Sequence, residues 1–81
     1  MTQEEILAEC TKIFIEQLDN SSIVLKRETT AADIDEWDSL NHIQIIVGIE
    51  KRFKIRFTSV EIQGFKSVGD MVDAISKKVN A

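Results

Sequence analysis

Asp38, Ser39 and His42 are residues of the types that carry out acyl transfer, and they lie close together in the sequence. A serine with a histidine one helical turn away and an acid beside it suggests a nucleophile and a general base. However, Asp38 and Ser39 are adjacent and so point in different directions, and no Gly-rich turn is present to supply an oxyanion hole. We therefore predict no catalytic residue in this chain, and an independent hydrolase is only a remote hypothesis.

Ser39 has two other possible roles. An apolar-periodic segment begins directly after it, where the side chain of Asp38 or Ser39 could accept a hydrogen bond from a backbone amide of the first helical turn. The same turn has unpaired amides and the positive end of the helix dipole, which favour a phosphate ester on the serine hydroxyl. The position therefore suits both a helix cap and a covalent modification.

The remaining polar residues predict no metal site. His42 is the only histidine and Cys10 the only cysteine, so neither has a spaced partner ligand. The mid-loop glycine and late glutamate of a calcium-binding EF-hand are missing around the acids Asp33, Asp35, Glu36 and Asp38. We interpret these acids as a solvated surface, and Cys10 as a small buried residue on the apolar face of a helix.

Hydrophobic periodicity predicts the elements that position these residues. Three long helices are expected, over residues 2–18, over 39–53 and from Ser67 onward, with apolar residues on one face of each. A short helix between the last two opens with the capping-box pair Thr58 and Glu61 and ends at Gly64. The predicted fold is all-α, a small four-helix bundle with one short helix.

Two connections complete this prediction. Residues 19 to 38 form a long loop between the first and second helices, and its scattered apolar residues indicate that it packs onto the core. The stretch "KIRF", residues 54–57, alternates like a strand but has no second strand to pair with, so we expect an extended connector.

The helix over 39–53 carries more apolar residues than one core face needs. We expect Leu40, Ile43, Ile46 and Phe53 to fill the core. The same helix also contains Ile45, Val47 and Gly48, so one or two apolar side chains should face outward and be available to a partner.

Composition limits the function classes. The chain of 81 residues, 43% hydrophobic and 30% charged, is long enough for one domain, 1–81, which we expect to be a soluble monomer. A net charge of −4 argues against nucleic acid as a partner. The longest uncharged stretch, 39–49, is too short to cross a membrane, and the acidic start does not resemble a signal peptide. With no internal disulfide available, the cytoplasm is the expected location.

The sequence "DSL", Asp38 to Leu40, after a long loop and at the head of an amphipathic helix, resembles the attachment site of acyl carrier proteins. The likeness continues through Phe53 and "SVGDMVDAI" and covers nearly the whole chain. It implies that a phosphopantetheinyl transferase adds 4'-phosphopantetheine from coenzyme A to Ser39, which Asp38 and Leu40 help to present. It also implies that the chain carries acyl groups as thioesters, does no chemistry of its own, and can shelter an apolar acyl chain in its core.

Departures from this family bear on the partners, which would be acyl-loading and acyl-processing enzymes. In the carriers of bacterial fatty acid synthesis that this chain resembles, the exposed face of the second helix carries a row of acids. The corresponding positions of this chain hold uncharged or basic residues. The residues expected to contact partners are Trp37, Asn41, Gln44, Val47, Gly48 and Lys51. Trp37, in place of the small residue often found before the Asp, together with "SLNHIQII", residues 39–46, looks more like a discrete carrier of a dedicated polyketide, nonribosomal peptide or surface-lipid route. An aminoacyl carrier and an unmodified helical interaction module remain as alternatives.

Overall fold

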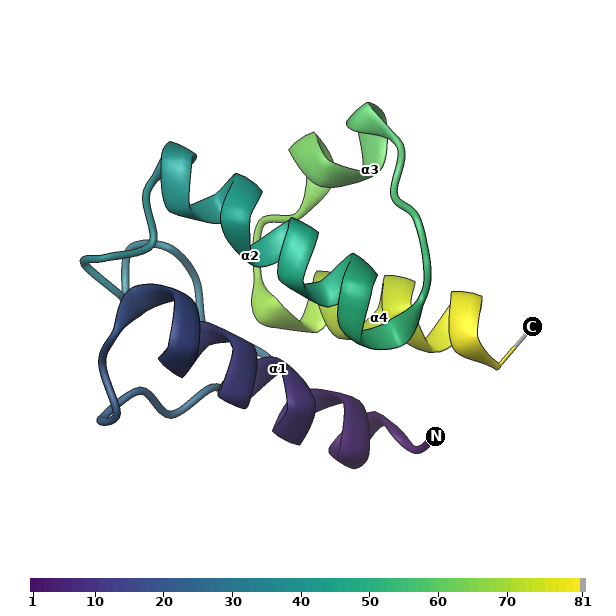
Figure 1. The fold of residues 1–81 in the computed structure, drawn as a ribbon, viewed down its shortest axis with the longest axis horizontal. Coiled ribbons are helices and arrows are strands. Elements are labelled where there is room, and N and C mark those ends of the chain that lie inside the picture. The colour runs from purple at the N-terminus through teal and green to yellow at the C-terminus, as the bar shows by residue number, and fades with distance from the viewer. Residues whose placement is uncertain (81) are drawn as a thin grey trace.

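The computed structural model describes residues 1–80, and in that range the chain forms four helices and no strand (Figure 1). The helices are α1 (Gln3–Leu18), α2 (Ser39–Phe53), α3 (Ser59–Gly64) and α4 (Val68–Val79). α1 packs against both α2 and α4, while the short α3 lies beyond α2 (Figure 1). The predicted all-α bundle with three longer helices and one short one is confirmed.

The helices begin where their caps predict. Thr2 forms a reciprocal capping box with Glu5, and Thr58 forms one with Glu61. At the start of α4 the Ser67 side chain accepts from the backbone amide of Asp70 at 3.4 Å. These bonds satisfy amides that a helix start otherwise leaves unpaired, so the local sequence is enough to fix the helix starts.

The core lies between α1, α2 and α4. Its fully buried side chains are Ile6, Cys10, Phe14, Ile45, Ile49, Val68, Met71, Val72 and Ile75. Burial raises the pKa of the Cys10 thiol to about 12, because the thiolate would be poorly solvated there. The interpretation of Cys10 as a buried core residue is confirmed.

The predicted core face of α2 needs correction. Ile46 is buried as expected and Phe53 is half-buried, but Leu40 is 68% and Ile43 is 59% exposed. Ile45 and Ile49 take the buried positions instead. The helix carries two apolar stripes of the same spacing, and the way α2 packs on α1 decides which stripe is buried.

The long loop between α1 and α2 packs onto the core, as predicted. Ile23, Leu25 and Ile34 are buried along it, whereas Val24 is 73% exposed. Residues 55–57 form a connector to α3 without helix or strand, as predicted. Lys54, which was expected to belong to this connector, is instead the C-cap of α2, with a left-handed backbone (φ 57°). Among residues 1–80 no helix is both long enough and apolar enough to cross a membrane.

Candidate functional site

Ser39 is the first residue of α2 and is exposed. The preceding residue, Asp38, is the helix cap: its backbone is extended, and its carboxylate accepts from the amide of Asn41 at 2.8 Å. Within residues 1–80 the Ser39 hydroxyl makes no hydrogen bond, so it is available from outside. The cap thus belongs to Asp38, and Ser39 is left free.

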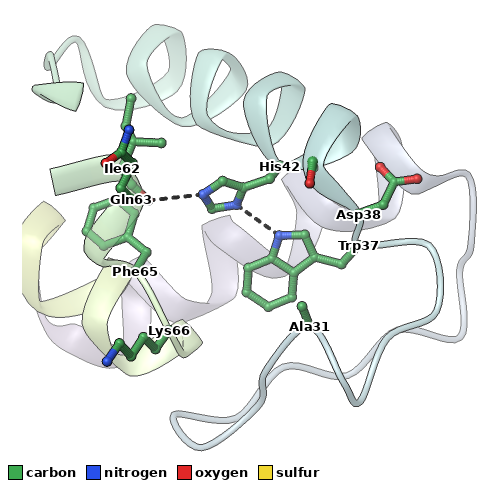
Figure 2. Close-up of a pocket in the computed structure, with 9 residues that line it drawn as sticks. Ala31, Trp37, Asp38, His42, Ile62, Gln63, Phe65 and Lys66 are labelled. Carbon is green, nitrogen blue, oxygen red and sulfur yellow. Dashed lines mark hydrogen bonds between the residues drawn. The ribbon is translucent and has the colours of Figure 1, made fainter. Parts of the chain in front are cut away.

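Ser39 lines a hollow of about 390 Å³. Figure 2 shows the side chains that surround this hollow. Its walls come from the loop, the start of α2, and the end of α3 with the connector that follows. They are formed by Ala31, Trp37, Asp38, Ser39, His42, Ile62, Gln63, Phe65 and Lys66. The hollow is therefore mostly apolar inside, with charged or polar side chains at its margin.

His42 joins two sides of this hollow (Figure 2). The indole N–H of Trp37 donates to His42 Nδ1 at 3.0 Å, and His42 Nε2 lies 3.3 Å from the backbone oxygen of Ile62. Since indole can only donate, His42 is the neutral tautomer with its proton on Nε2. Neither nitrogen is free to take a proton from Ser39, which argues against the serine hydrolase.

Trp37 was expected to contact partners, but the structure buries it. Its side chain is only 5% exposed, and its ring packs edge-on against Phe14 with the centroids 4.9 Å apart. The indole is a large apolar group at the end of the loop, and the core takes it up. Trp37 thus forms the inner wall of the hollow and offers little surface to a partner.

The other residues expected to contact partners lie along α2. Gln44 and Lys51 are exposed, and Val47 is 41% exposed. Asn41 is half-buried and its amide donates to the backbone oxygen of Glu36 at 2.8 Å, so it also holds the loop. A Cβ on Gly48 would lie 3.1 Å from Ile13 Cγ2, so this glycine allows α2 to approach α1 closely.

Sequence reasoning missed several residues of this region. Ile43 joins Leu40 and Val47 in an exposed apolar stripe on α2, and its spacing to both could have indicated that stripe. Ile62, Phe65 and Lys66 reach the hollow only through the fold, and no local pattern marks them.

Charge is distributed unevenly along α2. The loop acids lie near the Ser39 end, while exposed Lys51, Lys54 and Arg56 lie at the other end. Within residues 1–80 none of these three cations forms an ion pair, whereas Arg52 is paired with Glu9. A partner that approaches along α2 thus meets acids near Ser39 and unpaired cations at the far end.

Comparison with known proteins gives consistent results. A family profile described as "Phosphopantetheine attachment site" matches residues 5–75. The chain is similar to the acyl carrier protein of Thermosynechococcus vestitus, with 31% identity over 81 residues and all of both chains covered. It is 30% identical over 76 residues to that of Acidothermus cellulolyticus, covering 94% of this chain and 90% of the relative. A solution structure of a holo acyl carrier protein from Geobacter metallireducens superimposes with a TM-score of 0.87 and 48% identity, covering 93% of this chain and 86% of that one.

Proposed function

Because this chain belongs to the phosphopantetheine attachment-site family and is an acyl carrier protein, we propose that Ser39 is the residue that bears its 4'-phosphopantetheine arm. The thiol of that prosthetic group holds acyl groups as thioesters. The chain is accordingly a carrier and not an enzyme.

The observation that carries this proposal is the free, exposed hydroxyl of Ser39 at the head of α2. Ser67 differs from it, because the Ser67 hydroxyl is engaged as the cap of α4. Asp38 performs the capping at α2, so a modification of Ser39 would leave the helix start intact. A transferase can therefore reach this oxygen without unfolding the helix.

The surroundings of Ser39 suit a phosphodiester followed by a long arm. The first turn of α2 provides the positive end of a helix dipole, which favours an attached phosphate. Lys66 lines the hollow from the connector after α3, and its ammonium points away from Asp38 (Figure 2). Leu40, 68% exposed beside Ser39, gives a transferase an apolar contact. Asp38 and Leu40 are thus the residues we expect to position the arm or the enzyme that adds it.

Membership of the family implies encounters with a phosphopantetheinyl transferase and with enzymes of a synthetic pathway. We infer that these enzymes contact the exposed stripe of Leu40, Ile43 and Val47, flanked by Gln44 and Lys51. Surface charge steers weak and fast encounters of this kind. Since Gln44 and Lys51 are not acidic, partners with strongly basic docking surfaces should be attracted less, which supports a dedicated pathway.

The names of the relatives favour acyl over aminoacyl cargo. An aminoacyl carrier would share the same arm and fold, so the loading enzyme separates the two possibilities. The purified protein should be charged by an acyl-activating enzyme and not by an amino-acid-activating one.

Intact mass spectrometry tests the attachment. The purified chain, incubated with coenzyme A and a broad-specificity transferase, should gain the mass of one arm, and Ser39→Ala should gain none. Ser59→Ala is the matched control, because Ser59 also follows a helix cap and is the first residue of α3. This control should be modified like the wild type; an unmodified wild type would refute the proposal.

A further inference from the structure

We propose that His42 bars cargo from the core, so that this carrier shelters only short acyl groups, an inference that rests on the proposed attachment at Ser39. Cargo on an arm at Ser39 has the adjoining hollow within reach, and Trp37 and His42 form the inner wall of that hollow (Figure 2). The length of acyl group that fits depends on whether this wall can open.

The wall is fastened on both sides through one imidazole. Trp37 donates to His42 Nδ1 at 3.0 Å, and the proton on Nε2 is directed at the Ile62 oxygen at 3.3 Å. The neutral ring thereby connects three elements: the end of the loop at Trp37, the first turn of α2, and α3 at Ile62. An acyl chain that passed inward would have to displace His42 from both partners.

The space behind the wall is already filled. Trp37 packs edge-on against Phe14 at 4.9 Å, and Phe14 and Ile45 are fully buried. Displacing His42 would leave the N–H of Trp37, a residue only 5% exposed, without its hydrogen-bond acceptor, which is unfavourable for a donor so little exposed. A short acyl group avoids this cost, since it can stay in the outer hollow.

Loading with acyl chains of different length tests the proposal. The transferase and the matching acyl-coenzyme A would place butanoyl, octanoyl or dodecanoyl arms on the wild type, His42→Leu and His42→Gln. Gln is the conservative variant, because its amide can both accept from Trp37 and donate to Ile62. Thermal unfolding followed by circular dichroism then reports whether the chain is sheltered, since a sheltered chain stabilises the folded state.

In the wild type and in His42→Gln, we expect melting temperatures that do not change with chain length. In His42→Leu the melting temperature should rise by several degrees from butanoyl to dodecanoyl. A comparable rise in the wild type would overturn the proposal. Equal melting temperatures for the three acylated forms of a folded His42→Leu would also overturn it, because His42 would then not be what keeps the acyl chain out of the core.

A second measurement needs only the wild type and so survives a failure of His42→Leu to fold. Trp37 and His42 are the only tryptophan and histidine of the chain, so their ring N–H signals in NMR spectra are unambiguous. Each of the two signals should have the same chemical shift in the butanoyl form as in the dodecanoyl form. A dodecanoyl form in which the Trp37 signal shifts would contradict the proposal.

The mass of each loaded sample shows whether a failure concerns the attachment at Ser39 or only the barrier at His42. If no arm is added at Ser39, the proposed function fails and this inference fails with it. If loading is complete and stabilisation depends on chain length in the wild type, the inference on His42 fails alone.

Discussion

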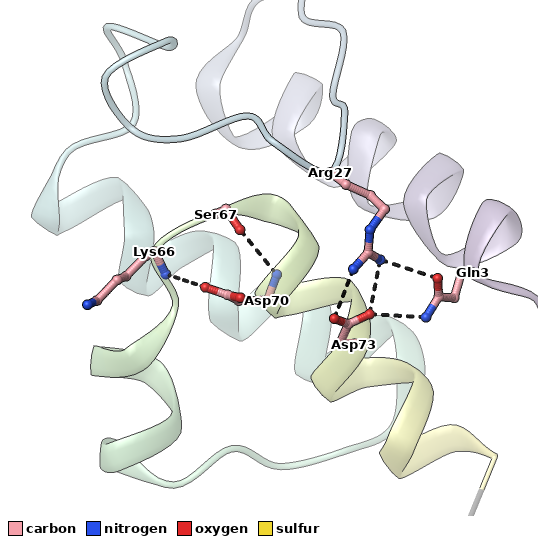
Figure 3. Close-up of polar contacts among 6 residues, drawn as sticks. All are labelled: Gln3, Arg27, Lys66, Ser67, Asp70 and Asp73. Atoms are coloured by element: carbon pink, nitrogen blue, oxygen red, sulfur yellow. Dashed lines mark hydrogen bonds and ion pairs between the residues drawn. The ribbon is translucent and has the colours of Figure 1, made fainter.

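The backbone N–H of Gly69 donates to the backbone oxygen of Arg27 at 2.8 Å and thereby ties the middle of the long loop to the first turn of α4. The neighbouring amide of Val68 donates to the oxygen of Thr29, also at 2.8 Å. Near these bonds the Arg27 side chain forms two hydrogen bonds with Asp73 (Figure 3). Loop and helix are thus joined by backbone and side-chain hydrogen bonds together.

Gly69→Ala should destabilise the fold by about 1–3 kcal/mol, the usual cost of overpacking a tight site. An added Cβ would lie 2.9 Å from the Arg27 oxygen, a backbone atom that can move only with the loop. The matched control is Gly64→Ala, where nothing lies within 4 Å of the added Cβ. Urea unfolding measures both variants; an equally stable Gly69→Ala would show that the loop is not fixed at this point.

Arg27→Gln should lower stability at neutral pH and lose its effect in acid. The Arg27 guanidinium hydrogen-bonds to Asp73 and holds the pKa of that carboxyl below its ordinary value of 3.8. A lowered pKa gives stability that is present above pH 3.8 and is lost as the pH falls through the pKa of the folded state. Both side chains are about half exposed, so the effect should be small.

Urea midpoints of the wild type and Arg27→Gln at pH 7, 5 and 3 test this dependence. The difference in urea midpoint between the two proteins should be the same at pH 7 and pH 5 and smaller at pH 3. Arg56→Gln, at an exposed arginine without an ion pair in residues 1–80, is the control and should match the wild type throughout. A difference that grew in acid would contradict the role given to Asp73.

Cys10 should not react with iodoacetamide in the folded protein at pH 8. Its side chain is fully buried and its pKa is raised to about 12 by that burial, so the reactive thiolate is scarce and inaccessible. After unfolding in guanidinium chloride the same thiol should be alkylated completely, as mass spectrometry would record. Rapid labelling without denaturant would mean that α1 opens at this point.

Gln44→Glu combined with Lys51→Glu should raise kcat/KM severalfold with enzymes of generic fatty acid synthesis, because basic docking surfaces would then be attracted to α2. The pair Lys26→Gln with Lys77→Glu changes the net charge by the same amount at exposed positions outside α2. Steady-state rates at low salt compare the two pairs. Equal rates for both would argue that the charge pattern of α2 does not select partners.

The parts of the fold that depend on neighbouring residues could be predicted from the sequence. The capping boxes of Thr2 and Thr58 fix the starts of α1 and α3 locally, and the single stripe of α4 admits one packing face. The buried face of α2 could not be predicted in this way. Its two stripes have equal spacing, so only the contact with α1 selects Ile45 over Leu40.

The candidate site likewise has a part that could be predicted from the sequence and a part that could not. Ser39, Asp38 and Leu40 were predicted because they are adjacent in sequence. The bridge from Trp37 through His42 to Ile62 could not be predicted from the sequence, because it joins the loop, α2 and α3. His42 and Ile62 are 20 positions apart in the chain. Its geometry exists only once α3 has packed against α2.

The attachment of the arm to Ser39 is tested most directly by locating the arm on the modified chain. Trypsin should release residues 28–51 as one peptide, whose hydroxyl groups are Thr29, Thr30 and Ser39. After transfer from coenzyme A, fragmentation of this peptide should place the added mass on Ser39 alone. An arm on either threonine, on another peptide, or on none after incubation with several transferases would contradict the assignment.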